Sequence, residues 1–304
     1  MRTNFLFLFS FCLIFVLTSC VAKAPVKNNS FDILGPNDQA AGQPIITAKK
    51  IETEKYPDGS PREYKYISPE GSFIYAVESI NEKGGIRIEG KIPNGLILQY
   101  ADSILVAQFN YNAGRLEGVV KEYYPNGTAS SVRNYKAGHL YGPAKEYYPN
   151  GKIKEEATYR DELLFGALRK YSETGVILTS YEYYDGKLCG IAKDFYSNGK
   201  IKTETEYLNG KKEGRQREYS SNGILITENN YSADKLEGQS RRFYEGGNIQ
   251  SVMNYSNGNI DGEAKIYSEN NPKAPIYIDL YSNGRKTKRR AYDSEGTLIF
   301  TLNY

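Results

Sequence analysis

The feature that most constrains this chain is a repeat of 24 residues. Tyrosines recur at this spacing, and a glycine follows each of them seven residues later. The tyrosines are Tyr111, Tyr135, Tyr159, Tyr183, Tyr207, Tyr231 and Tyr255, and the glycines are Gly118, Gly142, Gly166, Gly190, Gly214, Gly238 and Gly262. Seven consecutive copies keep this register without an insertion. A fixed period of this length predicts an array in which each copy is one supersecondary unit.

Each copy contains two turn signals, which leave room for two short strands. Residues 148–151 read Tyr-Pro-Asn-Gly, in which proline fixes φ, asparagine tolerates the left-handed region and glycine takes a positive φ. A second turn is expected at residues 136–138. Between the turns, Ile153 and Tyr159 share one parity and charged residues take the other, which is typical of a strand with one buried face. The recurring glycine has two interpretations: it admits a neighbouring ring, or it marks a simple bend.

These copies resemble the MORN-repeat variant of bacterial YwqK-type proteins, several of which are labelled antitoxins. The matching pattern runs from Gly142 through Lys145 to Lys152, and the resemblance covers about residues 107–304. It implies an all-β fold, an elongated antiparallel sheet of successive β-hairpins with one hairpin per 24-residue MORN-type repeat. It also implies that the usual role is binding, without catalytic residues.

The repeat weakens toward both ends of the array. Turn-like motifs at 56–59, 68–71 and 93–95 predict degenerate N-terminal repeats over residues 49–106, ahead of regular 24-residue repeats over 107–270.

At the other end, residues 271–275 read Asn-Pro-Lys-Ala-Pro in place of a turn, and Lys288 stands where the repeat glycine is expected. We therefore expect residues 271–304 to form an atypical C-terminal repeat and a cap with a polar end.

The N-terminus is expected to be a targeting segment. An almost entirely apolar run of 13 residues ends at Leu17, which suits a secretory signal and is too short to span a bilayer as a helix. It closes in Leu-Thr-Ser-Cys, which resembles the lipobox of bacterial lipoproteins and implies lipidation of Cys20; a plain signal peptide is the alternative. We expect a signal peptide over 1–19, a lipidated tether over 20–48, and a location in the cell envelope. The outer membrane is favoured if the cell is Gram-negative.

Composition argues against an enzyme. The chain has one His, three Cys and no Trp, which leaves little material for metal, thiol or imidazole chemistry. His139 has no second histidine to share a site, and Cys189 occurs in one copy only and is expected to be a tolerated surface substitution. A net charge of +3 excludes a protein defined by bulk charge. We expect no catalytic residue, no metal, no cofactor and no nucleic-acid partner.

Basic residues also recur at 24-residue spacing, and we call them the basic row. They are Lys121, Lys145, Arg169, Lys193, Arg217, Arg241 and Lys265. Each lies two residues before a recurring aromatic residue and so on the same face of its strand. The first interpretation is structural: the stems cover rings, or the charges pair with glutamates on neighbouring strands. The alternative is a row that binds a periodic anion, such as a glycan or lipid headgroups.

The sequence therefore predicts a binding protein. The first hypothesis is a non-enzymatic, lipid-anchored repeat scaffold that binds a protein partner in the envelope and contacts the membrane through the lipid on Cys20. The alternatives are a module that binds cell-wall or surface glycans, and an immunity or antitoxin-like protein.

Overall fold

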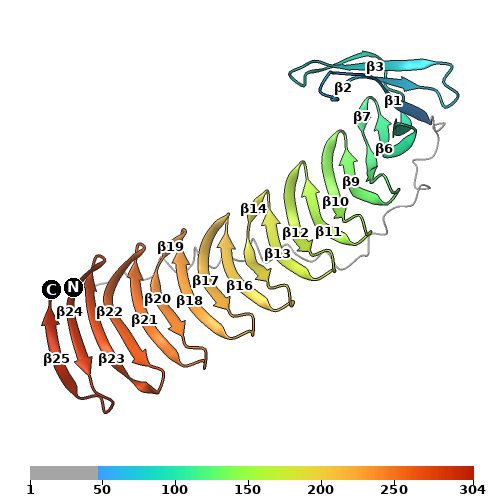
Figure 1. Cartoon of the computed structure of the whole chain (residues 1–304). Helices are drawn as coiled ribbons and strands as arrows, with labels where there is room; N and C mark the ends of the chain where they lie inside the picture. Colours follow the sequence, from blue (N-terminus) through green and yellow to red (C-terminus); the bar gives the residue numbers. More distant parts are fainter. Residues whose placement is uncertain (1–46) are drawn as a thin grey trace, which may run out of the picture. The chain divides into compact units, whose positions relative to one another are not determined.

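The computed structural model describes residues 47–304, which form 25 strands and no helix. The described chain divides into two compact units. The N-terminal unit comprises residues 47–166 with 173–175, and the C-terminal unit comprises 167–172 with 176–304. Within each unit, most successive strands pair as antiparallel hairpins in an open sheet (Figure 1). The all-β class and the hairpin repeat are therefore confirmed.

The expected signal peptide, Cys20 and nearly all of the expected tether lie outside the described residues. Strand β1 begins at Ala48, the last residue assigned to the tether. No helix among the described residues is long and apolar enough to cross a membrane.

The strands of the N-terminal unit follow one another with short connections. They are β1 (Ala48–Lys55), β2 (Pro61–Ile67), β3 (Ile74–Ile80), β4 (Ile86–Gly90), β5 (Gly95–Ala101), β6 (Ile104–Asn112), β7 (Arg115–Leu116), β8 (Gly118–Tyr123), β9 (Ala129–Lys136), β10 (His139–Tyr147) and β11 (Ile153–Arg160), and β12 (Leu163–Tyr171) begins in this unit.

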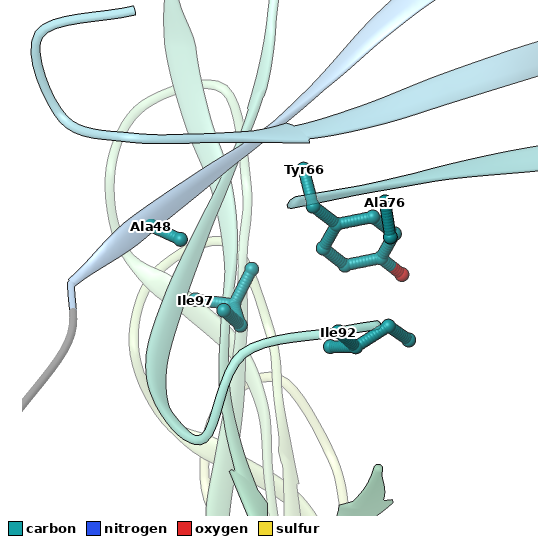
Figure 2. Close-up of a cluster of buried hydrophobic side chains, with 5 residues drawn as sticks. All are labelled: Ala48, Tyr66, Ala76, Ile92 and Ile97. Carbon is teal, nitrogen blue, oxygen red and sulfur yellow. The ribbon is translucent and has the colours of Figure 1, made fainter. Parts of the chain in front are cut away.

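The main apolar core lies where the first strands meet β5 and β6. Strand β1 pairs antiparallel with β2 and parallel with β5, so that Ala48 lies opposite Ile97. The buried residues of this core are Ala48, Tyr66, Ala76, Ile92 and Ile97. Figure 2 shows Ala76 and Ile92 near the Tyr66 ring, and Ala48 near Ile97. The parallel pairing thus gives the N-terminal strands an apolar core that a single layer of hairpins lacks.

A buried ion pair lies at the margin of this core. The Lys50 Nζ lies 2.9 Å from a carboxylate oxygen of Glu78, and the Tyr66 hydroxyl donates to the same carboxylate at 2.6 Å. Burial raises the pKa of the Tyr66 hydroxyl, and Glu78 raises it further. The hydrogen bonds satisfy the buried carboxylate, so this cluster serves the fold.

The C-terminal unit repeats the same hairpin. Its strands are β13 (Ile177–Tyr184), β14 (Lys187–Leu188), β15 (Gly190–Phe195), β16 (Ile201–Leu208), β17 (Lys211–Tyr219), β18 (Leu225–Ser232), β19 (Lys235–Leu236), β20 (Gly238–Phe243), β21 (Ile249–Ser256), β22 (Asn259–Ser268), β23 (Asn271–Ser282), β24 (Arg285–Tyr292) and β25 (Leu298–Asn303).

The two expected turns are present. At the Pro-Asn-Gly turn, the Gly151 N–H donates to the Tyr148 carbonyl at 2.8 Å, and Gly151 has a φ of +79°. Asn150 keeps a negative φ, so its tolerance of the left-handed region is not used in this turn. Its Oδ1 instead accepts a hydrogen bond from the Lys152 N–H at 3.0 Å. Asparagine therefore stabilises this turn through its side chain.

Non-glycine residues with a left-handed backbone lie in the second turn instead. Ala137 and Gly138 have φ values of +52° and +90°, which are the signs of a two-residue type I′ hairpin. Other copies place Asp185 and Gly186, or Asn209 and Gly210, in the same conformation.

The recurring glycine marks a bend, not a site for a ring. All seven members have φ between +70° and +101°. A Cβ built at Gly190 would meet nothing within 4 Å, and the same holds at Gly118, Gly238 and Gly262. At Gly214 the nearest atoms belong to the Glu206 carboxylate. Glycine is needed here for its backbone conformation at a bulge between the two turns.

One of the degenerate segments differs from expectation, and another lies within a strand. Residues 93–95 form no hairpin turn, because they lead from β4 to β5 and these two strands take different partners. Residues 271–275 lie inside β23, whose register against β22 shifts there.

Strand β25, the last strand described, is more apolar than the expected cap. The side chains of β25 are exposed, and Leu298, Ile299, Phe300 and Leu302 are among them. This strand therefore presents apolar side chains on both of its faces.

The positive φ of Gly190 predicts that a larger side chain can cost less stability there than a smaller one. Gly190→Ala is expected to lower the free energy of unfolding by about 1–2 kcal/mol, because a Cβ disfavours the left-handed region. Gly190→Asn, although larger, is expected to cost less, because asparagine tolerates that region. Urea denaturation of both variants measures the order. A larger loss for Asn than for Ala would show that space, not φ, selects glycine.

Candidate functional site

The basic row lies on strands, beside the recurring aromatic residues and on the same strand face. In the N-terminal unit, Lys121 pairs in register with Val132, and Lys145 with Glu156. On their other sides Lys121 lies opposite Gln108 and Lys145 opposite Val132, so Glu156 is the one acidic register partner of these two lysines.

In the C-terminal unit, carboxylates lie against most of the row. Lys193 Nζ is 2.9 Å from Glu204 Oε1, its direct partner on β16. Arg217 Nε is 2.8 Å from Glu228 Oε2, and Arg241 Nη1 approaches the other oxygen of Glu228 at 3.5 Å.

Two further members also lie near carboxylates. Lys265 Nζ lies 3.4 Å from Glu263 Oε2 on its own strand. Burial raises the pKa of Glu182, and the charge of Arg169 acts in the opposite direction. The positive charges of the row thus have carboxylates close by in this unit, and Arg217 and Arg241 share Glu228.

The surroundings of the Glu204 carboxylate favour its ionised form. Burial alone would raise the pKa of Glu204, but the hydrogen bond and charge of Lys193 hold it below its usual value. Tyr219 also donates to Glu204 Oε2 at 3.2 Å. Since the pKa is lowered in the folded chain, this pair stabilises the fold above the ordinary glutamate pKa and loses that effect as the pH falls below it.

The opposite strand face carries the recurring tyrosines. Each lies across from the recurring glycine of the preceding strand, as Tyr159 does from Gly142 and Tyr207 from Gly190. The rings are half-buried, and burial raises the pKa of Tyr207, to which Asp194 adds. Small or polar residues such as Ala157 and Thr205 lie between the rings and are buried.

A recurring acidic position was missed by sequence reasoning. In several copies the residue before the recurring glycine is Glu or Asp. Its carboxylate can accept a hydrogen bond from a backbone N–H in the turn of the next repeat. Glu117 Oε2 accepts from Ala137 N at 2.7 Å, and Glu237 Oε2 accepts from Asn257 N at 2.8 Å. The 24-residue recurrence of an acidic residue before glycine was the available signal.

The turns that correspond to residues 148–151 in successive repeats also bond to one another. The Tyr196 hydroxyl donates to the Tyr219 carbonyl of the next repeat at 2.8 Å, and Asn198 Nδ2 donates to the Ser221 carbonyl at 2.8 Å. Equivalent bonds start from Tyr124, Asn126 and Tyr244. The turn residues are therefore occupied in joining repeats.

The two residues weighed for chemistry have structural surroundings. His139 is exposed and its Nδ1 lies 3.3 Å from Glu162. Cys189 is 9% exposed, so the expectation of a surface position was wrong. It lies in the bulge between β14 and β15, where the strand alternation on which that expectation rested is interrupted. Within residues 47–304, no group of three or more His, Cys, Asp or Glu side chains is placed to hold a metal ion.

A buried carboxylate on β23 is also structural. Asp279 accepts from Arg289 at 2.7 and 2.8 Å, and Lys286 Nζ lies 2.7 Å from it. Burial would raise the pKa of Asp279, but these two cations hold it below its usual value. The cluster is fully paired and offers no open position for a ligand.

Comparison with known families identifies the repeat type. Five segments match the model of the MORN repeat variant: residues 116–137, 140–161, 188–209, 212–233 and 236–257. The sequence has no match among the curated proteins.

Solved structures with aligned stretches belong to much longer chains. The crystal structure of TcdB2-TccC3-Cdc42 aligns with 80% of this chain and 17% of its own, at 10% identity and a TM-score of 0.20. The crystal structure of TcdB2-TccC3 without its hypervariable C-terminal region aligns with 83% of this chain and 15% of its own, at 13% identity and a TM-score of 0.19. A structure of the Photorhabdus luminescens Tc holotoxin pore aligns with 77% of this chain and 16% of its own, at 11% identity and a TM-score of 0.17. Scores this low support no conclusion about fold or function.

The local charge balance predicts energetic coupling within the basic row. A double-mutant cycle of Arg217→Gln and Glu228→Gln is expected to give a coupling energy of about 0.5–1 kcal/mol in urea unfolding, because the pair is close and half-buried. The matched control is Lys265→Gln with Glu263→Gln, a longer pair on one strand, with an expected coupling near zero. Equal coupling in both cycles would show that the cross-strand geometry adds nothing to stability.

Proposed function

We propose that this chain is a non-enzymatic scaffold of MORN-type repeats, anchored in the cell envelope by lipid on Cys20, whose basic-row face binds a protein partner. The observation that carries the proposal is the pairing of four members of the basic row with carboxylates in the C-terminal unit; these members are Lys193, Arg217, Arg241 and Lys265. A periodic anion would meet positive and negative charges together on this face. A protein surface can complement such a mixed pattern.

Variation between copies supports the same conclusion. The residue two positions before each basic residue lies on the same strand face, and we call these positions the variable column. They are Val119, Pro143, Ala167, Ile191, Arg215, Gln239 and Glu263. The first four are apolar and the last three are polar or charged, and none is buried. A repeated frame with a changing column suits one particular partner, whereas a regular polymer would favour identical copies.

The alternative is a glycan-binding module, and the observation in its favour is the recurring tyrosines of the opposite face. Half-buried rings such as Tyr207 and Tyr231 could stack on sugars. In this alternative the basic row would bind anionic groups of the glycan, but the row lies on the strand face opposite these tyrosines.

The test compares two exposed apolar residues. Ile191, in the variable column, and Leu163, beside a turn, are each 50% exposed. Other copies carry lysine at the Leu163 position, as Lys187 and Lys211 show. Leu163→Lys is therefore the matched control for Ile191→Lys.

We expect affinity capture from envelope fractions to recover a defined protein with the parent chain and with Leu163→Lys, and several-fold less with Ile191→Lys. Peptidoglycan and anionic polysaccharide are the competing probes in the same assay. Salt-sensitive retention on polysaccharide, with protein capture equal in both variants, would contradict the proposal and support the glycan alternative.

A further inference from the structure

Strand β4 is an exposed edge in the N-terminal unit. It pairs with β3 and with no other strand of the described chain. All five of its residues, Ile86–Gly90, are exposed. An edge strand presents unpaired backbone groups, which form a template for another strand.

The pairing with β3 shows which backbone groups are available. Asn81 N donates to Gly85 O at 2.9 Å, and Lys91 N donates to Tyr75 O at 3.0 Å. Bonded pairs alternate along an antiparallel ladder, so Arg87 and Glu89 also direct their backbone groups toward β3. The N–H and C=O groups of Ile88 consequently point away from β3.

The side chains of β4 divide between the two faces of the sheet. Ile86 and Ile88 are 63% and 47% exposed and lie on the face that carries buried Ala76. Arg87 and Glu89 lie on the other face, with Arg87 Nη2 2.9 Å from Glu89 Oε1.

We propose that β4 is a self-association site, at which it pairs antiparallel with β4 of a second copy of this chain about a two-fold axis at Ile88. The sequence Ile-Arg-Ile-Glu-Gly is complementary to itself in this arrangement. Arg87 lies opposite Glu89 of the second copy, and Glu89 lies opposite its Arg87. The two Ile88 side chains lie side by side and cover each other on the apolar face.

Other pairings of the same strand are less favourable. A parallel pairing in register places like charges beside each other on neighbouring strands. An antiparallel pairing centred on Arg87 or Glu89 sets two identical charges directly opposite each other, which is destabilising. Charge complementarity therefore favours pairing with a second copy of β4 in one register. The same charges disfavour pairing with unrelated strands.

Disulfide cross-linking of the full chain tests this register. Across the proposed axis the two Ile88 Cα atoms lie about 5.5 Å apart, within the range a disulfide spans. Ile88→Cys is expected to give a covalent dimer on a non-reducing gel. The matched control is Glu82→Cys, an exposed position between β3 and β4, which is expected to give several-fold less dimer.

Charge exchange in the Ile88→Cys background distinguishes self-pairing from other occupants. Arg87→Glu alone and Glu89→Arg alone are each expected to lower the dimer yield about tenfold, because both cross-strand pairs become repulsive. The double exchange is expected to restore the dimer, and so is a mixture of the two single variants.

Absence of the Ile88→Cys dimer would overturn the proposal, whether the edge is free or is covered by residues 1–46 or another protein. A dimer whose yield ignores the charge exchanges would overturn it as well.

Discussion

Each repeat depends on hydrogen bonds that its turns make to the adjacent repeat. A single layer of hairpins buries little apolar surface, and several of its buried positions in the repeats are alanines, such as Ala144, Ala192 and Ala264. Turn amides supply further contacts: Gly138 N donates to Leu116 O at 2.9 Å and Gly210 N to Leu188 O at 2.8 Å. Tyrosine and asparagine side chains do the same at the opposite turns. Since each bond joins neighbours in sequence, stability is expected to be largely a nearest-neighbour property.

This requirement explains the fixed period. A turn N–H reaches the preceding repeat only if both turns keep their length and φ signs, so an insertion would displace a donor from its acceptor. The recurring glycine serves the same register by making the bulge between the turns. At these bulges, side chains such as Asn134 and Asn230 donate to main-chain carbonyls at 2.6 Å, which satisfies backbone groups that the interrupted ladder leaves unpaired.

Much of the fold could be predicted from spacing, because turn residues and alternating parity report local backbone geometry. The hairpins, both turns and the basic row followed from it. The parallel β1–β5 pairing and the buried Lys50–Glu78 pair could not, since they join segments that share no period. The burial of Cys189 was missed because a bulge breaks parity. The pairing of Arg241 with Glu228 needed the register between hairpins, which sequence spacing alone left open.

Hydrogen exchange resolved to single turn amides tests the nearest-neighbour account most directly. Gly138 and Gly210 donate to the preceding repeat, whereas Gly114, in the corresponding turn of an earlier copy, donates to no backbone carbonyl of the described chain outside the strand ladders. We predict slow exchange at Gly138 and Gly210, governed by opening of the neighbouring repeat, and fast exchange at Gly114. Equally fast exchange at all three amides would show that turn-to-turn hydrogen bonds do not hold the repeats together.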